Sequence, residues 1–194
     1  MPKIKLLISV LNIPRFIFHI ICFLRYYSIC ESDIIVGIEH RKYKCSVFIG
    51  FIYLLTFDSF FRNLFYKRIG NLKYFIQFLA PSHNSFFINT HMYVGKSFLC
   101  IHPFGTYVNA KSVGDNFTIR NNVTIGDKNG CTPIIGNNVT VNVNSVVVGN
   151  IKIGNNVVIG ACSLIMKDVP DNCVVAGNPA YIIKREGVPC KEKL

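Results

Sequence analysis

Residues 134–170 read IIGNNVTVNVNSVVVGNIKIGNNVVIGACSLIMKDVP, and the spacing of their aliphatic residues decides the fold. An aliphatic residue stands at every sixth position, namely at Ile135, Val141, Val147, Ile153, Ile159 and Ile165. An α-helix repeats its apolar positions about every 3.6 residues, and an isolated β-strand repeats them every two. A period of six fits neither, and it is typical of a parallel β-helix built from hexapeptides.

The period of six extends upstream of this stretch. Val113, Ile119 and Ile125 keep it, and four extra residues then separate Ile125 from Ile135. Small or aliphatic residues stand four positions after most of these residues, at Val123, Val139, Ser145, Ile151, Val157, Ser163 and Val169. Three hexapeptides form one coil of about 18 residues. Residues 88–168 therefore predict about four to five coils.

The first coil keeps the period less strictly. Ile88, Val94 and Cys100 are six apart, and a slip of one residue near Pro103–Gly105 makes Tyr107 the next expected interior position. Gly and Asn recur beside the repeat, as in the Gly136-Asn-Asn sequence, and these residues tolerate the positive φ that tight corners need. Known hexapeptide β-helices wind left-handed. We therefore predict a mainly β fold, a left-handed parallel β-helix, preceded by an α-helical region.

Three parts of the chain follow from this pattern. Residues 1–86 are expected to be helical, with an amphipathic helix over Tyr53–Leu79 that bends near Gly70. Residues 87–183 are expected to form the β-helix, and residues 184–194 a basic C-terminal tail. Pro81 and the polar residues after it mark the first boundary.

Charge and cysteine content restrict the partners and the compartment. The formal net charge is +11, which favours an anionic partner such as a phosphorylated cofactor or a membrane headgroup. No nucleic-acid-reading motif is present, so nucleic acid is not expected. The eight cysteines include no C-x-x-C pair, which predicts no zinc site and no disulfide framework. Buried, reduced thiols in a cytoplasmic protein are the expectation.

Residues 4–24 are apolar, but they do not read as a clear membrane span. Pro14, Arg15 and His19 interrupt the run, and an intramembrane arginine is unfavourable. No small-residue cleavage site follows, since the next residues are Arg25, Tyr26 and Tyr27. Packed helices are favoured over a spanning anchor. Peripheral contact with an anionic inner membrane remains open.

Two interruptions of the repeat are the places where function is expected. The first surrounds His102, and the second is the insertion Asp127–Pro133, which should protrude as a loop. A single histidine is more often structural than catalytic. Because His102 lies at an irregularity of the repeat, a functional role for it is better supported than composition alone would suggest.

The residues around these interruptions resemble a known family. The segments VGKSFLCIHPFGTYVNAKSVG (94–114), NNVTIG (121–126), residues 134–170 and NCVVAGNPAYIIK (172–184) are similar to the hexapeptide acyltransferases, and most of all to the serine O-acetyltransferase branch. The segment FRNLFYKRIG (61–70) resembles the helical lead-in of small relatives from capsule and exopolysaccharide gene clusters.

The resemblance implies an activity and a set of site residues. Acetyl-CoA would lie in a groove between coils, usually of two subunits in a homotrimer, without a metal. His102 would be the catalytic general base that takes the proton from the acceptor hydroxyl. Cofactor-binding positions carried over from the family are Gly126, Ala161, Lys167, Gly177 and Pro179, with Lys184 and Arg185 as weaker candidates for the phosphates.

The chain departs from the serine-binding pattern of that branch. Phe87 and Ile101 stand where the branch has acids, and residues 131–133 read Cys-Thr-Pro in place of Arg-His-Pro. A carboxylate acceptor binds poorly without a cation. A sugar hydroxyl in surface-polysaccharide synthesis is therefore the leading expectation, and serine O-acetyltransferase of cysteine biosynthesis is the alternative. Candidate substrate-binding residues are Asn89, Asn109, Asn121 and Asp127, any of which can equally be a turn residue.

Other functions on the same fold are weaker. An amine-acetylating relative is a third hypothesis. A γ-type carbonic anhydrase needs three zinc-binding histidines, whereas only His91 and His102 lie in the repeat. A non-enzymatic solenoid serving as a scaffold would need neither His102 nor the AGNPA segment at 176–180.

Overall fold

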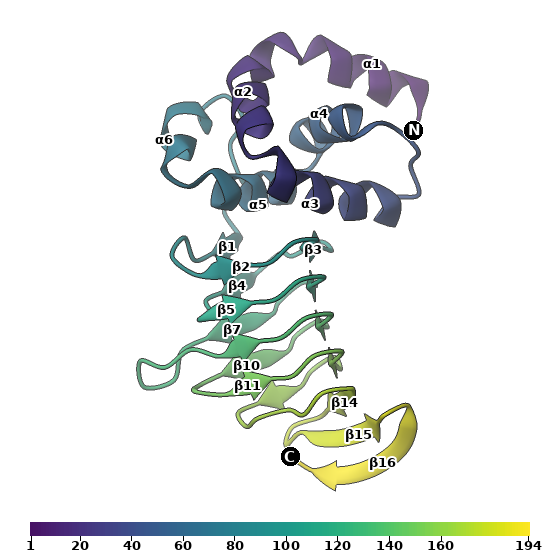
Figure 1. The fold of residues 1–194 in the computed structure, drawn as a ribbon, viewed down its shortest axis with the longest axis vertical. Helices are drawn as coiled ribbons and strands as arrows, with labels where there is room; N and C mark the ends of the chain where they lie inside the picture. Colours follow the sequence, from purple (N-terminus) through teal and green to yellow (C-terminus); the bar gives the residue numbers. More distant parts are fainter. The chain divides into compact units, whose positions relative to one another are not determined.

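The computed structural model describes residues 1–194, which form two compact units, Met1–Asn84 and Ser85–Leu194 (Figure 1). The first unit is helical and the second is a β-solenoid. The helices are α1 (Lys3–Leu11), η1 (Pro14–Phe16), α2 (Ile17–Arg25), α3 (Tyr27–His40), α4 (Val47–Phe57), α5 (Ser59–Ile69), η2 (Gly70–Leu72) and α6 (Lys73–Ile76). The boundary falls two residues before the one expected from the sequence.

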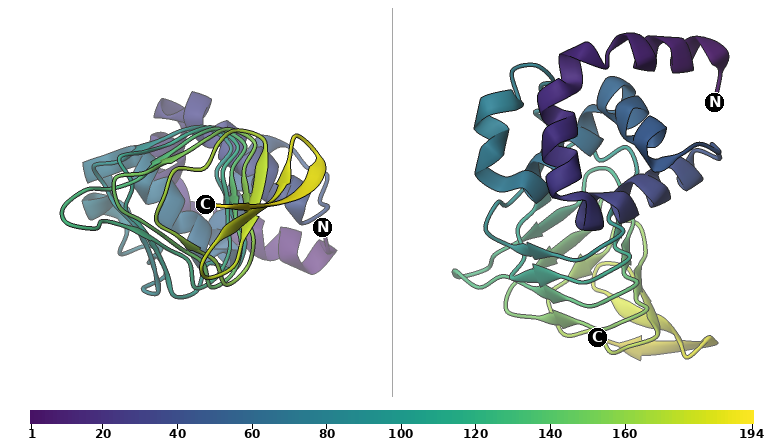
Figure 2. Two further views of the ribbon diagram at one scale, coloured as in Figure 1. Left: turned by 90° about the horizontal axis from the view of Figure 1, so that it is seen from below. Right: turned by 45° about the horizontal axis from the view of Figure 1, so that its top comes forward.

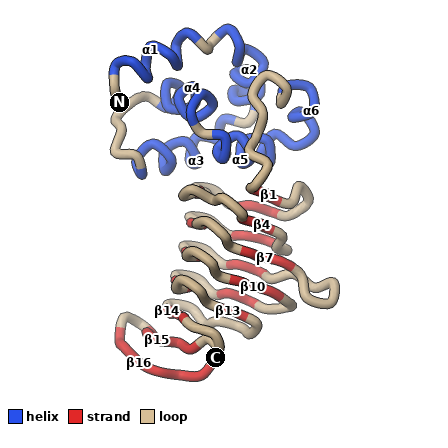
Figure 3. Tube along the Cα trace, turned by 180° about the vertical axis from the view of Figure 1, so that it is seen from behind, coloured by secondary structure: helices blue, strands red, loops and turns tan.

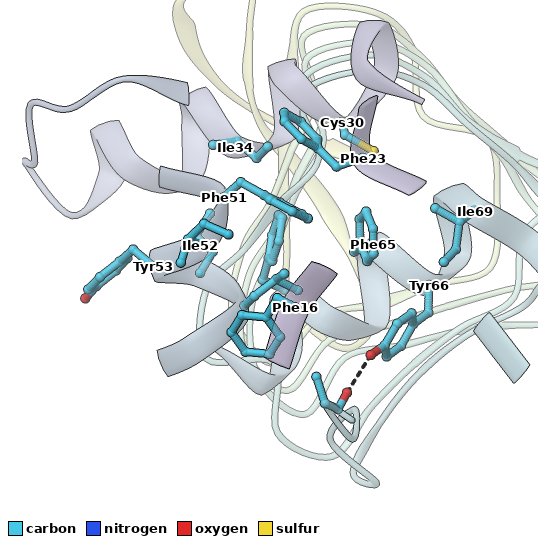
Figure 4. Packing of buried hydrophobic residues seen from close by; sticks show 14 of the residues in the cluster. Phe16, Phe23, Cys30, Ile34, Phe51, Ile52, Tyr53, Phe65, Tyr66 and Ile69 are labelled. Atoms are coloured by element: carbon cyan, nitrogen blue, oxygen red, sulfur yellow. Dashed lines mark hydrogen bonds between the residues drawn. The ribbon is translucent and has the colours of Figure 1, made fainter. Parts of the chain in front are cut away.

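An aromatic core holds the helical unit together. Phe23 stacks on Phe51 with ring centroids 4.3 Å apart, and Phe51 packs on Phe65 at 5.2 Å (Figure 4). Two polar side chains, His19 and Tyr66, share this core and are hydrogen-bonded there, although His19 Nδ1 has no partner. Tyr66 donates a hydrogen bond to the Ala80 carbonyl at 2.6 Å, and His19 Nε2 lies 2.9 Å from the Tyr66 hydroxyl. Burial of such groups without partners would be strongly unfavourable.

The predicted helix over Tyr53–Leu79 is divided at two places. The bend expected at Gly70 is confirmed, since α5 ends at Ile69 and Gly70 has a φ of +60°. A second break occurs at Asp58, which was not expected. The Asp58 side chain accepts hydrogen bonds from the backbone N–H groups of Phe60 and Phe61, both at 2.9 Å, and so starts a new helix as its N-cap.

The solenoid is built from three stacks of short strands, as the coils drawn in Figures 1 and 3 show. Sheet A contains β1 (Phe86–Ile88), β4 (Thr106–Val108), β7 (Thr124–Gly126), β10 (Val146–Val148) and β13 (Leu164–Ile165). Sheet B contains β2 (Tyr93–Val94), β5 (Ser112–Val113), β8 (Ile134–Ile135) and β11 (Lys152–Ile153). Sheet C contains β3 (Leu99–Cys100), β6 (Thr118–Ile119), β9 (Thr140–Val141), β12 (Val158–Ile159), β14 (Cys173–Ala176), β15 (Tyr181–Arg185) and β16 (Val188–Lys193).

The residues at the period of six form the interior, as predicted. All nine, from Val113 to Ile165, are at most 3% exposed, and the residues four positions later are also buried except Asn129 in the inserted loop. Within sheet A the parallel register stacks Val108 on Ile125, Ile125 on Val147, and Val147 on Ile165. The interior is therefore a packed column of aliphatic side chains. Viewed along the coils, successive turns superpose in Figure 2 (left).

One interior position was wrongly assigned. Tyr107 points outward and is 42% exposed, whereas Val108 is fully buried. Cys100 pairs with Ile119 and Tyr107 with Thr124, so the first coil uses two more residues than the second between sheets C and A. A shortening by one residue before Val113 partly cancels this insertion. The sequence shows only the net slip of one residue. It therefore predicts Tyr107, and not Val108, at the interior position.

Asparagines form a hydrogen-bonded ladder along the corner between sheets B and C. Asn116 Nδ2 donates to Asn138 Oδ1, Asn138 to Asn156, and Asn156 to Asn172, at 2.7–2.8 Å. Asn116, Asn138, Asn156 and Asn172 all have φ near +56°, which asparagine tolerates well. The preceding glycine serves a different purpose, because a Cβ at Gly136 would lie 2.7 Å from the Gly154 carbonyl oxygen of the next coil.

The C-terminal residues and the cysteines differ from expectation. Residues 184–194 do not form a free tail, because β15 and β16 pair as an antiparallel hairpin that extends sheet C. This hairpin covers the last parallel strand, whose open edge would otherwise be exposed. All eight cysteines are free, but only Cys30 and Cys173 are buried. Cys45, Cys131 and Cys162 are exposed because they occupy loops and corners. The expectation of buried thiols is therefore confirmed only for Cys30 and Cys173.

Candidate functional site

His102 lies in the two residues that the first coil adds at the corner between β3 and β4. Its φ is +47°, its side chain is exposed, and its carbonyl accepts a hydrogen bond from the Phe104 N–H at 2.7 Å. The flanking Ile101 and Pro103 are buried and anchor this corner. The insertion therefore turns the imidazole out of the prism toward solvent. No hydrogen bond within this chain orients the ring.

Three other predicted residues lie at the same corner of the solenoid as His102. Asn121 precedes β7 and Ala161 precedes β13, each by three residues. Gly177 lies beside the start of β13, since its carbonyl accepts from the Leu164 N–H at 3.1 Å and its N–H donates to Ser163 Oγ at 3.1 Å. Parallel strands all begin at one edge of their sheet. His102, Asn121, Ala161 and Gly177 therefore line the edge of sheet A where its strands begin.

The remaining predicted residues gather at the opposite edge of sheet A. Asn89 and Asn109 directly follow β1 and β4, and the Asn89 amide donates to Asn109 Oδ1 at 2.6 Å. Gly126 ends β7 beside Asn109, Asp127 begins the inserted loop, and Lys167 follows β13. The side chains of Asn89 and Asn109 thus form a hydrogen bond with each other, like the corner asparagines of the ladder. Of the predicted residues only Arg185, a weaker candidate, lies at the corner between sheets B and C, where it pairs with Cys173 next to the ladder residue Asn172.

The inserted loop leaves the solenoid directly after β7. Lys128 and Cys131 form a short antiparallel bridge, and Asp127 Oδ2 accepts a hydrogen bond from the Gly130 N–H at 3.3 Å. Residues 127–131 are all exposed, and Figure 3 shows this loop protruding from the coils. The expected protrusion is confirmed for residues 127–131, whereas Thr132 is half-buried and Pro133 is buried.

The outer face of sheet A lies between these two edges. Its first two strands, β1 and β4, carry aromatic side chains on this face. Phe87 and Tyr107 face outward from neighbouring strands, with exposures of 47% and 42%. Their rings are nearly parallel, at 10°, with centroids 4.8 Å apart. Because Phe87, Tyr107 and Thr124 are aligned across β1, β4 and β7, this stack begins a ladder on the outer face. The sequence does not predict this stack, because its repeat places Tyr107 in the interior.

A shallow pocket of about 140 Å³ lies near the last coil and joins two predicted cofactor residues. Lys167 and Pro179 line it together with Leu164, Met166 and Lys193. The Lys167 ammonium donates to the Leu194 carbonyl at 2.8 Å. Lys193 was not predicted as a site residue, because the hairpin that carries it was expected to be a tail. The weaker candidates Lys184 and Arg185 lie in β15, where Arg185 pairs with Glu192 at 2.6 Å.

No group of three or more histidine, cysteine, aspartate or glutamate side chains is arranged to hold a metal ion. Among the five histidines only His19 is buried, and it lies in the helical unit. Burial, followed by the charges of Arg15 and Arg62, lowers the pKa of His19 to about 4. His19 is thus neutral in its aromatic core, where it has a structural role.

Known proteins resemble the chain in sequence and in fold. Residues 132–167 match the family model "Bacterial transferase hexapeptide (six repeats)". A serine acetyltransferase of Staphylococcus epidermidis is 34% identical over 131 residues, covering 63% of this chain and 62% of that protein. The chain thus spans less than two thirds of the length of this curated relative.

Two solved structures resemble the chain in fold. The serine acetyltransferase of Neisseria gonorrhoeae superposes with a TM-score of 0.68 at 25% identity, covering 84% of this chain and 67% of that one. A serine acetyltransferase of Brucella abortus strain S19, solved in complex with coenzyme A, has a TM-score of 0.70 at 22% identity, covering 91% and 74%. The second likeness supports the fold, a left-handed parallel β-helix with an N-terminal helical region.

Proposed function

We infer that the chain is a hexapeptide-repeat acyltransferase of the serine acetyltransferase-like branch, and we propose that it transfers an acetyl group from acetyl-CoA to a hydroxyl. The observation that carries the proposal is the placement of His102. Its exposed imidazole lies in an insertion of the solenoid, at the edge of sheet A that also carries Asn121, Ala161 and Gly177.

His102 would act as the general base. A neutral hydroxyl group is a poor nucleophile, and imidazole is well suited to accept its proton near neutral pH. His102 takes this proton while the acceptor oxygen forms a bond to the acetyl carbon and the carbon–sulfur bond breaks. The resulting imidazolium then returns the proton to the departing thiolate. Positioned general bases of this kind contribute about 10²–10⁴-fold to the rate.

The pocket beside the last coil supports a binding role for the predicted cofactor residues. Lys167 and Lys193 bring two cations to one pocket, and cations suit the phosphates of coenzyme A. Ala161 and Gly177 lack large side chains, so an extended pantetheine arm can approach the backbone at that edge. The Brucella relative solved with coenzyme A supports acetyl-CoA as the donor.

Serine is the acceptor that the relatives favour. The Staphylococcus and Neisseria proteins are both serine acetyltransferases. They support the serine alternative better than the polysaccharide acceptor that heads the expectations from sequence. Serine is therefore the first acceptor to test.

A sugar hydroxyl remains the second candidate, and the Phe87–Tyr107 stack favours it. Flat aromatic faces pack well against ring-shaped ligands, and both rings are partly exposed. At the same time Cys131, Thr132 and Pro133 offer no charge to hold a carboxylate. Asn109, Asn121 and Asp127 are the groups that would donate or accept hydrogen bonds to sugar hydroxyls.

Acetyl transfer can be measured with the purified full chain, acetyl-CoA and either serine or a set of sugars. Loss of the thioester absorbance is the better readout, because exposed Cys45, Cys131 and Cys162 would react with a thiol reagent. Turnover with serine alone would assign the serine reaction, and turnover with sugars alone would assign the second candidate. The absence of turnover with any hydroxyl acceptor would contradict the proposed activity.

We also propose that the active assembly is a homotrimer. Exposed apolar side chains of sheet B, Tyr93 at 66% and Ile134 at 37%, would be partly covered by a neighbouring subunit, and apolar surface of this kind is typical of interfaces. Light scattering after size-exclusion chromatography should give three times the 21.9 kDa mass of the chain. A monomer at the concentrations used for turnover would contradict this assembly.

A further inference from the structure

The first helix of the chain faces solvent with its apolar side. Ser9 is the only buried residue of α1, and its hydroxyl donates to the Lys5 carbonyl at 2.9 Å. In contrast, Ile4, Leu7 and Leu11 are 74%, 60% and 70% exposed. A helix on a water-exposed surface buries its leucines and exposes its serines. The arrangement in α1 is the reverse.

Helix α2 continues this surface after the turn at Pro14. It buries His19 and Phe23 against the aromatic core but leaves Phe18, Ile21 and Leu24 more than half exposed. We call the combined surface the α1–α2 apolar face. Its exposed residues are Ile4, Leu6, Leu7, Ile8, Val10, Leu11, Ile17, Phe18, Ile21 and Leu24. Exposed apolar side chains gathered on two consecutive helices usually contact a partner or a membrane.

The charged side chains that α1, η1 and α2 themselves carry are all positive. Lys3, Lys5, Arg15 and Arg25 are the only charged side chains before Glu31. Lys3, Arg15 and Arg25 are exposed, and the Lys5 ammonium lies over the Phe57 ring at 5.5 Å from its centroid. Apolar helices whose own charges are all positive are complementary to anionic headgroups above acyl chains.

We propose that the α1–α2 apolar face binds the surface of an anionic lipid bilayer and lies in its interface. No single helix of the chain is long and apolar enough to cross a membrane. Helices Lys3–Leu11 and Pro14–Arg25 meet the length and composition only as a pair bent by 53°. A nine-residue helix spans about 14 Å, which is about half of a hydrocarbon core. Lying in the interface fits these lengths better than crossing.

The charges also distinguish lipid from a second copy of the chain. A symmetric contact would place the same patch of each copy against the other. The cations of both copies would then repel each other, with no acid among residues 1–30 to balance them. Anionic headgroups balance the same charges favourably. The inference depends only on the helical unit and is independent of the proposed acetyl transfer.

Cosedimentation with vesicles tests the proposal directly. The full chain should bind vesicles of phosphatidylcholine containing about a third phosphatidylglycerol, and should bind pure phosphatidylcholine much more weakly. Replacing two exposed leucines, Leu7→Gln with Leu11→Gln, should reduce binding about tenfold or more. Replacing two cations, Lys3→Gln with Arg25→Gln, should reduce binding to the anionic vesicles about thirtyfold.

A matched control uses exposed aliphatic residues of the C-terminal hairpin. Ile183→Gln with Val188→Gln removes two side chains that are 44% and 65% exposed and should leave vesicle binding unchanged. The proposal is overturned if the wild-type chain stays in the supernatant with anionic vesicles at low salt. It is also overturned if the Leu7/Leu11 variant binds like the wild type.

A third outcome would assign the surface to a different partner. A lipid-independent increase in mass that the Leu7/Leu11 variant abolishes would identify a second copy as the occupant, and would overturn the lipid proposal. Acetyl transfer measured without lipid should be equal in the wild type and the Leu7/Leu11 variant. A chain with no transferase activity can still bind vesicles, so the two proposals fail separately.

Discussion

At the scale of single residues, His102 combines a strained backbone with an exposed ring. Its φ of +47° lies in the left-handed region, where asparagine is tolerated far better than alanine. His102→Asn should therefore keep the corner intact while removing the general base. We expect acetyl transfer to fall about 10²–10⁴-fold, with an unchanged melting temperature measured by circular dichroism. Undiminished turnover in a folded variant would remove His102 from the mechanism.

Phe87 separates the two candidate acceptors. Phe87→Ser removes one ring of the stack on sheet A from an exposed position, so folding should be little affected. If the acceptor is a sugar that packs on this ring, its KM should rise about two- to tenfold, while kcat changes less. If the acceptor is serine, its KM should stay the same. Steady-state kinetics with both acceptors distinguishes these outcomes.

At the scale of elements, the asparagine ladder stabilises one corner of the solenoid. Asn138 donates to Asn156 and accepts from Asn116, both at 2.8 Å, and has a φ of +56°. Asn138→Ala loses both bonds and also places an alanine in the left-handed region. We expect the free energy of unfolding to fall by roughly 2–3 kcal/mol, as measured by denaturant titration.

Asn138→Gly is the control for this prediction. Glycine adopts the left-handed conformation without strain but makes no side-chain hydrogen bond. The glycine variant should therefore be destabilised less than the alanine variant, by roughly 1–2 kcal/mol. Equal losses in the two variants would mean that backbone strain contributes nothing at this corner.

At the scale of the whole molecule, the two compact units should respond differently to acid. The pKa of His19 is lowered from 6.5 to about 4 in the folded chain, because the ring is buried near Arg15 and Arg62. Between these values the unfolded chain binds more protons, so the free energy of unfolding falls as the pH drops. From pH 6.5 to 4 the loss should approach about 3 kcal/mol, and it should level off below that range.

This acid sensitivity belongs to the helical unit, where His19 contacts Tyr66. Thermal melting followed by circular dichroism near pH 5 should show the helical signal disappearing before the β signal. His19→Gln has no group that titrates in this range, so the stability of its helical unit should change little with pH between 6.5 and 4. A single transition that shifts equally in both proteins would show that His19 is not the cause.

Part of the site was predictable because it follows from the repeat. His102 and the loop at 127–133 were found as interruptions of a regular pattern, which sequence counting detects well. The Phe87–Tyr107 stack was missed, because an insertion of two and a shortening by one appear in the sequence as a slip of one. The break at Asp58 was also missed, since its capping bonds become visible only in the folded chain.

The sequence by itself determined the solenoid, because a side chain every six residues can be buried together only in stacked three-sided coils. It also determined that His102 and the inserted loop depart from that order. Only the tertiary structure decided which edge of which sheet each candidate residue occupies, and that the leucines of α1 face outward. Both depend on register and packing between segments distant in the chain, and periodicity along one segment carries no information about them.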